Sequence, residues 1–527
     1  MVRPRRQILS VSLFTLLSLA AASCNLIGRE EATVAGTVSS TTTSVVIAPV
    51  TDGASFEWSM APRFGLDVNG DGRPDIPNTF EYVHNLEPGS CAVGCEATTP
   101  VFTVELDASG SALDAGEIEE YRWEIEVEGD ATSARLRTEE PATTADLPEG
   151  EYEVTLVVAG GGVEAAVTQQ VVVEDILILS LGDSYAAGEG NPERPGDPPV
   201  WADDGTSNPG SKQSLDHDAA HRTGLAGPAQ VALEIERADP HTSVTFVFLA
   251  SSGATIEEGV TGPRVDIPIG SGEEIDLRPQ VEEAAELIGC RSSGGCDREV
   301  DVVTLSIGGN DAGFSSTIGL LVALDGGLLT DNVQARLLEG IMTEADRGLA
   351  TLPGLFGELD LALDVLDPEQ VFITAYPAPT RTVGDGGTRL CEEIAGDLLF
   401  GLEVDAMEIE AAESRLLVGL NERVGQAAAD HSWTYVDGHV AEFESHGYCG
   451  TAPYDPAAYA GNPFPDQPEP LDDPAVRWFR QAEESNVIQG ALDDLFKPEQ
   501  LSTSGTLHPN ELGHQAYKRA LLDAMGY

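Results

Sequence analysis

Short apolar runs alternate with longer amphipathic segments through the C-terminal part of the chain. The apolar runs lie at 176–181, 244–249, 300–307, 371–375 and 433–436. Most of them are continuously apolar, which is typical of parallel strands buried on both faces. Because strands that alternate with helical segments indicate an α/β domain, we predict about five parallel strands here, with a closing helix after Asn510.

The preceding segment, from Val101 to Glu174, has a different pattern in which apolar and polar residues alternate. Residues of this kind occupy 101–106, 121–127, 152–158 and 167–173, with Gly-rich turns between the runs. A period of two indicates half-buried strands, and several such strands in succession predict a small β-sandwich. Trp123 fits the core of this sandwich better than a ligand platform.

The N-terminal residues predict export. Residues 1–23 combine a basic start, an apolar stretch from Ile8 to Leu19 and small residues before Cys24. This order is typical of a cleaved signal peptide, and the apolar stretch is too short for a standard membrane span. Residues 24–43 are rich in Thr, Ser, Gly and Glu, which indicates a flexible tether. We therefore divide the chain into the signal at 1–23, the tether at 24–43, a β and loop region at 44–98, the sandwich at 99–175 and the α/β domain at 176–527.

The charge of the chain excludes one class of partner. It has 527 residues, and its 89 Asp and Glu face 28 Lys and Arg, which gives a formal net charge of −61. Such a surface repels nucleic acid and anionic bilayers, so we expect no nucleic-acid partner. The acidic residues are spread along the chain. This pattern suits a secreted protein from a saline habitat, and solubility alone is an equal alternative.

The cysteines predict disulfides. Leaving Cys24 aside, an even number remains in a chain that is predicted to be exported. Proximity in the sequence suggests three pairs, Cys91 with Cys95, Cys290 with Cys296, and Cys391 with Cys449. The spacing of Cys and His does not fit a structural zinc site.

A loop before the sandwich has the spacing of a calcium site. Asp67, Asn69, Asp71 and Asp75 place side-chain oxygens at mostly alternate positions around a glycine turn. One such loop can wrap a hard cation. The match to an EF-hand loop is incomplete because its twelfth position is Asn78 instead of Glu. We expect structural calcium here, with a metal-free polar turn as the alternative.

Four short blocks in the α/β domain carry groups suited to acyl transfer. Ser184 follows the first apolar run, Gly253 the second and Asn310 the third, and His508 precedes the closing helix. The carboxyl ends of parallel strands meet at one edge of a sheet, so these residues should lie together. An ester carbonyl requires an activated hydroxyl, a base with a pKa near neutral, and donors aimed at the developing oxyanion.

These blocks, in this order, resemble the SGNH (GDSL-like) hydrolases, and more closely their secreted branch similar to Streptomyces esterases. The resemblance implies a three-layer αβα, flavodoxin-like domain at 176–527 that needs no cofactor for catalysis. It implies that Ser184 is the nucleophile and His508 the base. The N–H groups of Ser184 and Gly253 and the side chain of Asn310 would form the oxyanion hole. The absence of a Gly-x-Ser-x-Gly elbow around Ser184 argues against an α/β-hydrolase.

Two further resemblances concern the N-terminal part. The small residues before Cys24 resemble a bacterial lipobox, which implies a lipid anchor on Cys24, with an ordinary cleaved signal as the alternative. Residues 99–175 resemble a PKD/immunoglobulin-like domain, a kind of module that usually spaces or binds. Together these features predict a protein that is exported and either lipid-anchored or secreted, with membrane contact only through its anchor.

The chain departs from the commoner family pattern in two places. Where many relatives have an Asp three residues before the His, Gly505 stands, so we predict a Ser-His dyad in which the Gly505 carbonyl orients His508. The alternative is a carboxylate that reaches His508 from elsewhere in the chain, and Glu511 is the nearest one in the sequence. Ala220 and Ser251 occupy positions where the branch often has cysteines, which suggests that a disulfide was lost as a pair.

The sequence favours a monomeric hydrolase of carboxylic esters that acts on lipids, acetylated glycans or small esters. One alternative is a surface-binding lipoprotein with a vestigial hydrolase fold, and another is an acyltransferase to a sugar hydroxyl. Two insertions, at 314–368 and 381–432, carry leucine-rich helical stretches. They could form an apolar acyl pocket or lid, or extra core.

Overall fold

The structure is a computed structural model, and it describes only part of the chain. The described residues are 53–64, 91–93, 100–114, 116–127, 133–194, 199–202, 212–269, 274–291, 294–324, 331–384, 387–391, 393–395, 403–451, 476–489 and 504–527. The predicted signal, tether and calcium loop lie outside these residues, as do Cys24 and Cys95.

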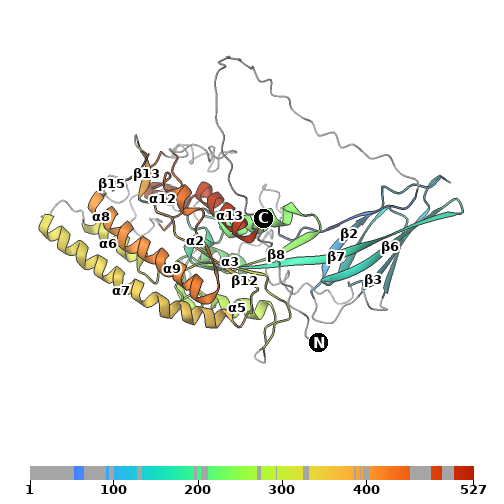
Figure 1. The fold of residues 1–527 in the computed structure, drawn as a ribbon, viewed down its shortest axis with the longest axis horizontal. Helices are drawn as coiled ribbons and strands as arrows, with labels where there is room; N and C mark the ends of the chain where they lie inside the picture. The colour runs from blue at the N-terminus through green and yellow to red at the C-terminus, as the bar shows by residue number, and fades with distance from the viewer. Residues whose placement is uncertain are drawn as a thin grey trace, which may run out of the picture. The chain divides into compact units, whose positions relative to one another are not determined.

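A mixed sheet of eight strands organises the fold (Figure 1). Its order is β17-β12-β11-β7-β6-β3-β4, and β8 also pairs with β7. The parallel part consists of β7 (Val163–Gly182), β8 (Thr242–Phe248), β11 (Val302–Ser306), β12 (Gln370–Thr374) and β17 (Thr434–Val436). Each of these strands overlaps one of the apolar runs, which confirms the predicted mixed α/β class.

Strand β7 belongs to both halves of this sheet. Its first half alternates between exposed and buried residues and pairs antiparallel with β6 (Gly150–Gly160). Its second half is almost continuously buried and pairs in parallel with β8 and β11. The change in hydrophobic pattern near residue 175 therefore marks a change of partners within one strand, and the boundary that we predicted there falls inside β7.

The N-terminal half of β7 contributes to a β-sandwich. Strands β3 (Glu120–Val127) and β4 (Ser133–Thr138) continue its sheet beyond β6, and a second, three-stranded antiparallel sheet contains β1 (Glu57–Met60), β2 (Phe102–Asp107) and β5 (Ala142–Leu147). Trp123 is buried in the core formed by both sheets, where its ring meets Phe56 edge-on at 5.2 Å. This confirms that Trp123 is a core residue.

Helices pack against both faces of the parallel strands. Leu177 and Leu179 of β7 belong to a core cluster that includes residues of α5 (Gln280–Leu287), α7 (Asp331–Leu363) and α9 (Val418–His431). Ile178 belongs to a different cluster with residues of α4 (Gly227–Ala238) and α13 (Glu511–Met525). Because neighbouring strand residues point to opposite faces, these two clusters are the two faces of the sheet. Helix α13 is the predicted closing helix, and the Asn510 side chain caps its first turn.

The insertions form additional core among the described residues. Helices α6 (Phe314–Leu324), α7, α8 (Ala406–Ala411) and the π-helical segment η2 (Ala412–Leu417) share a buried cluster that contains Leu321, Met342 and Ile409. The remaining elements are short: α3 (Lys212–Ala220), β9 (Arg264–Pro268), β10 (Glu274–Leu277), β13 (Arg381–Gly384), β14 (Gly387–Leu390), β15 (Glu393–Ala395), β16 (Glu403–Asp405), α10 (Val440–Phe443) and α12 (Ala482–Gln489).

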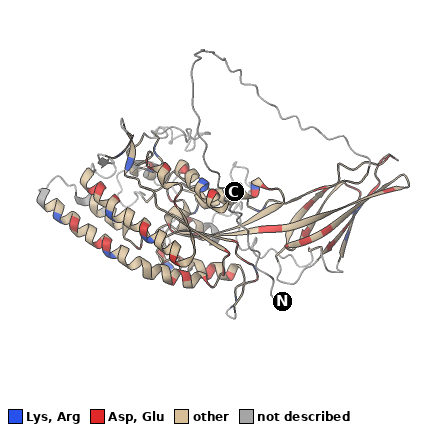
Figure 2. Ribbon diagram, viewed as in Figure 1, with Lys and Arg blue, Asp and Glu red and all other residues tan. Residues whose placement is uncertain are grey.

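Acidic residues occur on both strands and helices of the described chain, and basic residues are sparse among them (Figure 2). This distribution agrees with the spread of charge along the sequence. Among the helices that the structure describes, none has both the length and the apolar character needed to cross a bilayer.

Candidate active site

The turn after β7 positions Ser184. Gly182 ends the strand with φ of 126°, and a Cβ at this position would lie 2.2 Å from the carbonyl oxygen of Ser306 on β11, so only glycine fits. Asp183 then caps the short helix α2 (Ser184–Ala187) by accepting a 3.0 Å hydrogen bond from the N–H of Tyr185. Ser184 is thereby the first residue of helix α2. It is buried, with 8% of its surface exposed.

His508 contacts Ser184 although the two residues lie far apart in the sequence. Its Nε2 atom lies 2.8 Å from Ser184 Oγ. The turn that carries His508 is closed by its own N–H, which donates to the Gly505 carbonyl at 3.0 Å, and Leu507 within it has φ of 66°. The structure thus brings together the two residues that the sequence proposes as nucleophile and base.

Two main-chain carbonyls lie beside the His508 side chain, those of Thr506 and Gly505. His508 Nδ1 lies 3.2 Å from the carbonyl oxygen of Thr506, whereas the Gly505 carbonyl accepts the His508 main-chain N–H. The predicted Gly505 carbonyl also acts on the His508 side chain, since both carbonyls raise the pKa of the imidazole. The kind of partner, a neutral main-chain oxygen, is as expected.

The rival acid, Glu511, points to a cation. Its Oε1 atom lies 2.7 Å from Nη2 of Arg480, a fully buried arginine. Burial lowers the pKa of His508, while the charge of Glu189 and the carbonyls of Thr506 and Gly505 oppose that effect without cancelling it. The imidazole is consequently neutral near pH 7 and able to accept a proton.

The other two blocks lie against one another. The side-chain amide of Asn310 donates a 2.9 Å hydrogen bond to the carbonyl of Ala254, which follows Gly253. Asp311 accepts the N–H of Ile256 at 3.0 Å and so joins the same two turns. Gly253 is exposed, with φ of 78°, and Asn310 is partly exposed, so both remain accessible to a ligand.

A buried pair connects the Ser184 turn with the Asn310 turn. The Tyr376 hydroxyl donates to the Asp183 carboxylate and accepts from the N–H of Gly309 at 3.2 Å. Burial raises the pKa of Asp183 to about 7, against the lowering effect of the hydrogen bonds from Tyr376 and Tyr185. Asp183 therefore fixes the geometry between two of the blocks instead of facing the reacting groups.

Two residues that fix the His508 turn were missed by the sequence analysis. The Tyr185 hydroxyl donates to the Leu507 carbonyl at 2.9 Å. Arg480 exchanges main-chain hydrogen bonds with Leu507 and His508, and its guanidinium reaches the Gly190 carbonyl at 3.1 Å and Asn191 at 2.8 Å. Tyr185 directly follows Ser184, which was a usable signal, whereas no signal marked Arg480 because it lies outside the four short blocks.

A buried carboxylate beside the site was also missed. Glu189 is fully buried, and its Oε2 atom lies 2.6 Å from Nδ1 of His221, whose ring stacks on Trp201 with centroids 4.3 Å apart. The sequence placed Glu189 in a glycine-bearing turn. A carboxylate between Gly188 and Gly190, a few positions after Ser184, was the signal that could have identified it.

The two positions of the suspected lost disulfide belong to neighbouring segments. The N–H of Ser252, next to Ser251, donates to the Ala220 carbonyl at 2.9 Å. His514 is fully buried in α13, and its Nδ1 accepts the N–H of Gly227 at the start of α4.

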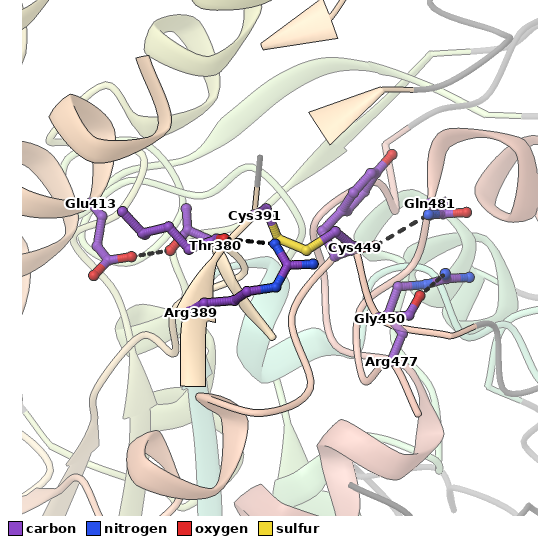
Figure 3. The surroundings of a disulfide bond; sticks show 10 residues. Thr380, Arg389, Cys391, Glu413, Cys449, Gly450, Arg477 and Gln481 are labelled. Atoms are coloured by element: carbon purple, nitrogen blue, oxygen red, sulfur yellow. Dashed lines mark hydrogen bonds between the residues drawn. A yellow bond between two sulfur atoms is a disulfide. The ribbon is translucent and has the colours of Figure 1, made fainter. Parts of the chain in front are cut away.

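The described residues contain two of the three predicted disulfides, Cys290–Cys296 and Cys391–Cys449. The third pair includes Cys95, which lies outside the described residues. Figure 3 shows the surroundings of Cys391–Cys449, where Gln481 donates to the Tyr448 carbonyl at 3.2 Å and Arg477 to the Gly450 carbonyl at 3.1 Å. Cys449 of this disulfide therefore lies between Tyr448 and Gly450, whose carbonyls contact the segment 477–481 that contains Arg480.

No group of metal-binding side chains occurs among the residues that the structure describes. The predicted calcium ligands Asp67, Asn69, Asp71 and Asp75 are outside them, so structural calcium stays a prediction.

Comparison with known proteins adds little to this geometry. No family model and no curated protein matches the chain. A carbohydrate acetylesterase from Xanthomonas citri is a structural neighbour with 12% sequence identity and a TM-score of 0.21. The match covers 64% of this chain and 64% of that one, which is less than two thirds of the neighbour. At this TM-score the likeness carries no argument about function.

Proposed function

We propose that the chain is a serine hydrolase of carboxylic esters that uses a dyad of Ser184 and His508. The observation that carries the proposal is the 2.8 Å contact between Ser184 Oγ and His508 Nε2, beside the paired turns of Gly253 and Asn310. A hydroxyl in contact with a neutral imidazole is the arrangement that nucleophilic catalysis requires.

The proposed reaction proceeds through an acyl-enzyme. His508 Nε2 accepts the Ser184 proton while Oγ attacks the ester carbonyl, and the protonated imidazole then gives this proton to the departing alcohol. The N–H groups of Ser184 and Gly253 and the amide of Asn310 stabilise the oxyanion. Water, deprotonated by His508, then attacks the acyl-enzyme carbonyl. His508 returns this proton to Ser184 Oγ as the acid is released. The Thr506 carbonyl holds the Nδ1 proton and fixes the tautomer.

We also propose that the domain at 176–527 is of the SGNH type and that the sandwich at 99–175 is a PKD/immunoglobulin-like module that spaces or binds. The order of the four blocks along the chain supports the first assignment. The proposal includes export and a lipid anchor on Cys24, and the two disulfides are compatible with an oxidising compartment.

The proposed substrates are esters of lipids, acetylated glycans or small alcohols. The contact between Ser184 and His508 favours this activity over a purely binding role, for which neither residue is needed. Hydrolysis and acyl transfer share every residue of the mechanism up to the acyl-enzyme.

The test is a screen of the purified full-length mature protein against p-nitrophenyl esters of graded chain length, a phospholipid and an acetylated polysaccharide. We expect turnover of at least one ester, and no turnover for His508→Ala. A sugar alcohol added as acceptor distinguishes hydrolysis from acyl transfer, because a transferase forms a new ester with the acceptor whereas a hydrolase releases the free acid. If no ester is turned over, the binding role replaces this proposal.

A further inference from the structure

Glu189 lies at a junction of the segments that carry Ser184 and His508. Its main-chain N–H donates to the Ser184 carbonyl at 3.0 Å. Its Oε1 atom accepts hydrogen bonds from Ser504 Oγ at 2.8 Å and from Gln489 Nε2. Its Oε2 atom is shared with His221. Glu189 thus contacts the helix of Ser184 through its main-chain N–H, and helix α12 and the segment that leads to His508 through its buried carboxylate.

The contacts of Gln489 extend this connection. Gln489 Oε1 accepts the N–H of Gly505 at 3.0 Å, while its amide group donates to Glu189. Gly505 is the residue whose carbonyl closes the turn around His508. Glu189 therefore contacts Ser504 directly, and it contacts Gly505 through Gln489.

We propose that Glu189 is the positioning residue that replaces the missing triad acid, by fixing the His508 turn and by stabilising the His508 imidazolium through space. This inference rests on the proposed function, because it assigns a role toward His508 as base. In a conventional triad the carboxylate holds Nδ1 directly. Here the Thr506 carbonyl contacts Nδ1, and the carboxylate of Glu189 contacts Ser504, in the segment that leads to His508.

The charges around the two groups support this role. Although burial alone would raise the pKa of Glu189, the charges of His221 and His508 and the hydrogen bonds from His221 and Ser252 lower it well below its usual range. Glu189 is thus anionic whenever the enzyme is folded near neutral pH. In the protein interior such a charge acts strongly over several ångströms because little water screens it.

Several other charged or titratable groups face these two. Arg264 is coupled electrostatically to Glu189, and protonated His221 opposes the charging of His508. His514 lies on α13, and burial, followed by the charges of His508 and Arg480, lowers its pKa. Glu189 is the anion among these groups that raises the pKa of His508.

The test replaces the carboxylate by an isosteric amide. In Glu189→Gln the pKa of His508 should fall further, so the acid limb of the kcat/KM profile should move to lower pH by about one unit. The plateau of kcat should fall about tenfold, because one unit of pKa corresponds to a tenfold change in stabilisation of the imidazolium. The matched control is Glu234→Gln, which removes an exposed carboxylate on α4 and should change neither quantity.

A second variant should move the acid limb of the kcat/KM profile in the opposite direction. It also serves as the test if Glu189→Gln does not fold. His221→Gln removes a neighbour whose positive charge lowers the pKa of His508, so its acid limb should move to higher pH. An unshifted limb in Glu189→Gln, or a shift of the same sign in both variants, overturns the inference. If the first variant does not fold, an unshifted or lowered limb in His221→Gln overturns it.

A direct titration separates this inference from the proposed function. The His508 imidazole is followed by NMR in protein labelled at histidine, with His508→Ala used to assign its signal. A lower pKa in Glu189→Gln supports the coupling even if no ester is turned over, and an unchanged pKa overturns it. Loss of the proposed function appears separately, as absence of turnover in the wild-type protein.

Discussion

The Tyr185 hydroxyl donates a 2.9 Å hydrogen bond to the Leu507 carbonyl, so the residue after Ser184 is bonded to the residue before His508. Tyr185→Phe should therefore leave a buried carbonyl without its donor and lower the free energy of unfolding by about 1–3 kcal/mol. We expect kcat to fall several-fold in parallel, because the His508 turn loses one of its anchors. Denaturant unfolding and steady-state kinetics on the same ester measure both effects. Unchanged stability together with unchanged kcat would contradict this role.

Asn310→Ala should lower kcat by about 10²-fold while changing KM little, because the amide is proposed to meet charge that exists only in the transition state. The variant also loses the hydrogen bond to Ala254, so its folding is checked by circular dichroism. A change in KM with unchanged kcat would instead assign Asn310 to binding of the substrate in its ground state.

Glu511→Gln should keep kcat/KM within about threefold of the wild-type value, because Glu511 pairs with Arg480. A threefold loss corresponds to less than about 1 kcal/mol of transition-state stabilisation. His508→Ala, measured beside it, should eliminate turnover. Equal losses in the two variants would restore a conventional triad with Glu511 as its acid.

Asp183 predicts a pH dependence of stability. Its pKa is raised to about 7 in the folded chain from an ordinary value near 3.8, so the unfolded state loses this proton first. The stabilisation is complete below pH 3.8 and is lost as the pH rises through about 7. Relative to Asp183→Asn, the wild-type protein should become progressively less stable over that interval. Unfolding measured in both proteins at a series of pH values tests this, and a constant difference would contradict it.

The strands could be predicted from the sequence because burial leaves a local signature. Continuous apolar runs identify the parallel strands, and alternating runs identify the sandwich. The continuity of β7 could not be predicted, because each half of the strand has the pattern of a different layer. Only the strand pairing reveals a single strand, because β7 pairs with β6 up to Val173 and with β8 from Glu174 onward.

The contact between the proposed nucleophile and base could be predicted for a similar reason, since Ser184 and His508 stand in short blocks, one at a strand end and one before the closing helix. The choice between Gly505 and Thr506 as the partner of Nδ1 depends on the closure of one turn, which the residue types do not encode. Arg480 and Glu189 act through contacts with residues hundreds of positions away in the chain, such as Glu189 with Ser504. No local pattern marks contacts of that kind.

Covalent labelling of Ser184 tests the central claim most directly. The purified full-length mature protein is treated with a fluorophosphonate, whose phosphorus is attacked by an activated serine with loss of fluoride. Intact mass and peptide mapping should then show one adduct, on Ser184. Labelling should be absent in Ser184→Ala and slowed by several orders of magnitude in His508→Ala, as expected for a nucleophile that depends on its base. Labelling of Ser184→Ala at the wild-type rate, or an adduct on another serine, would contradict the account.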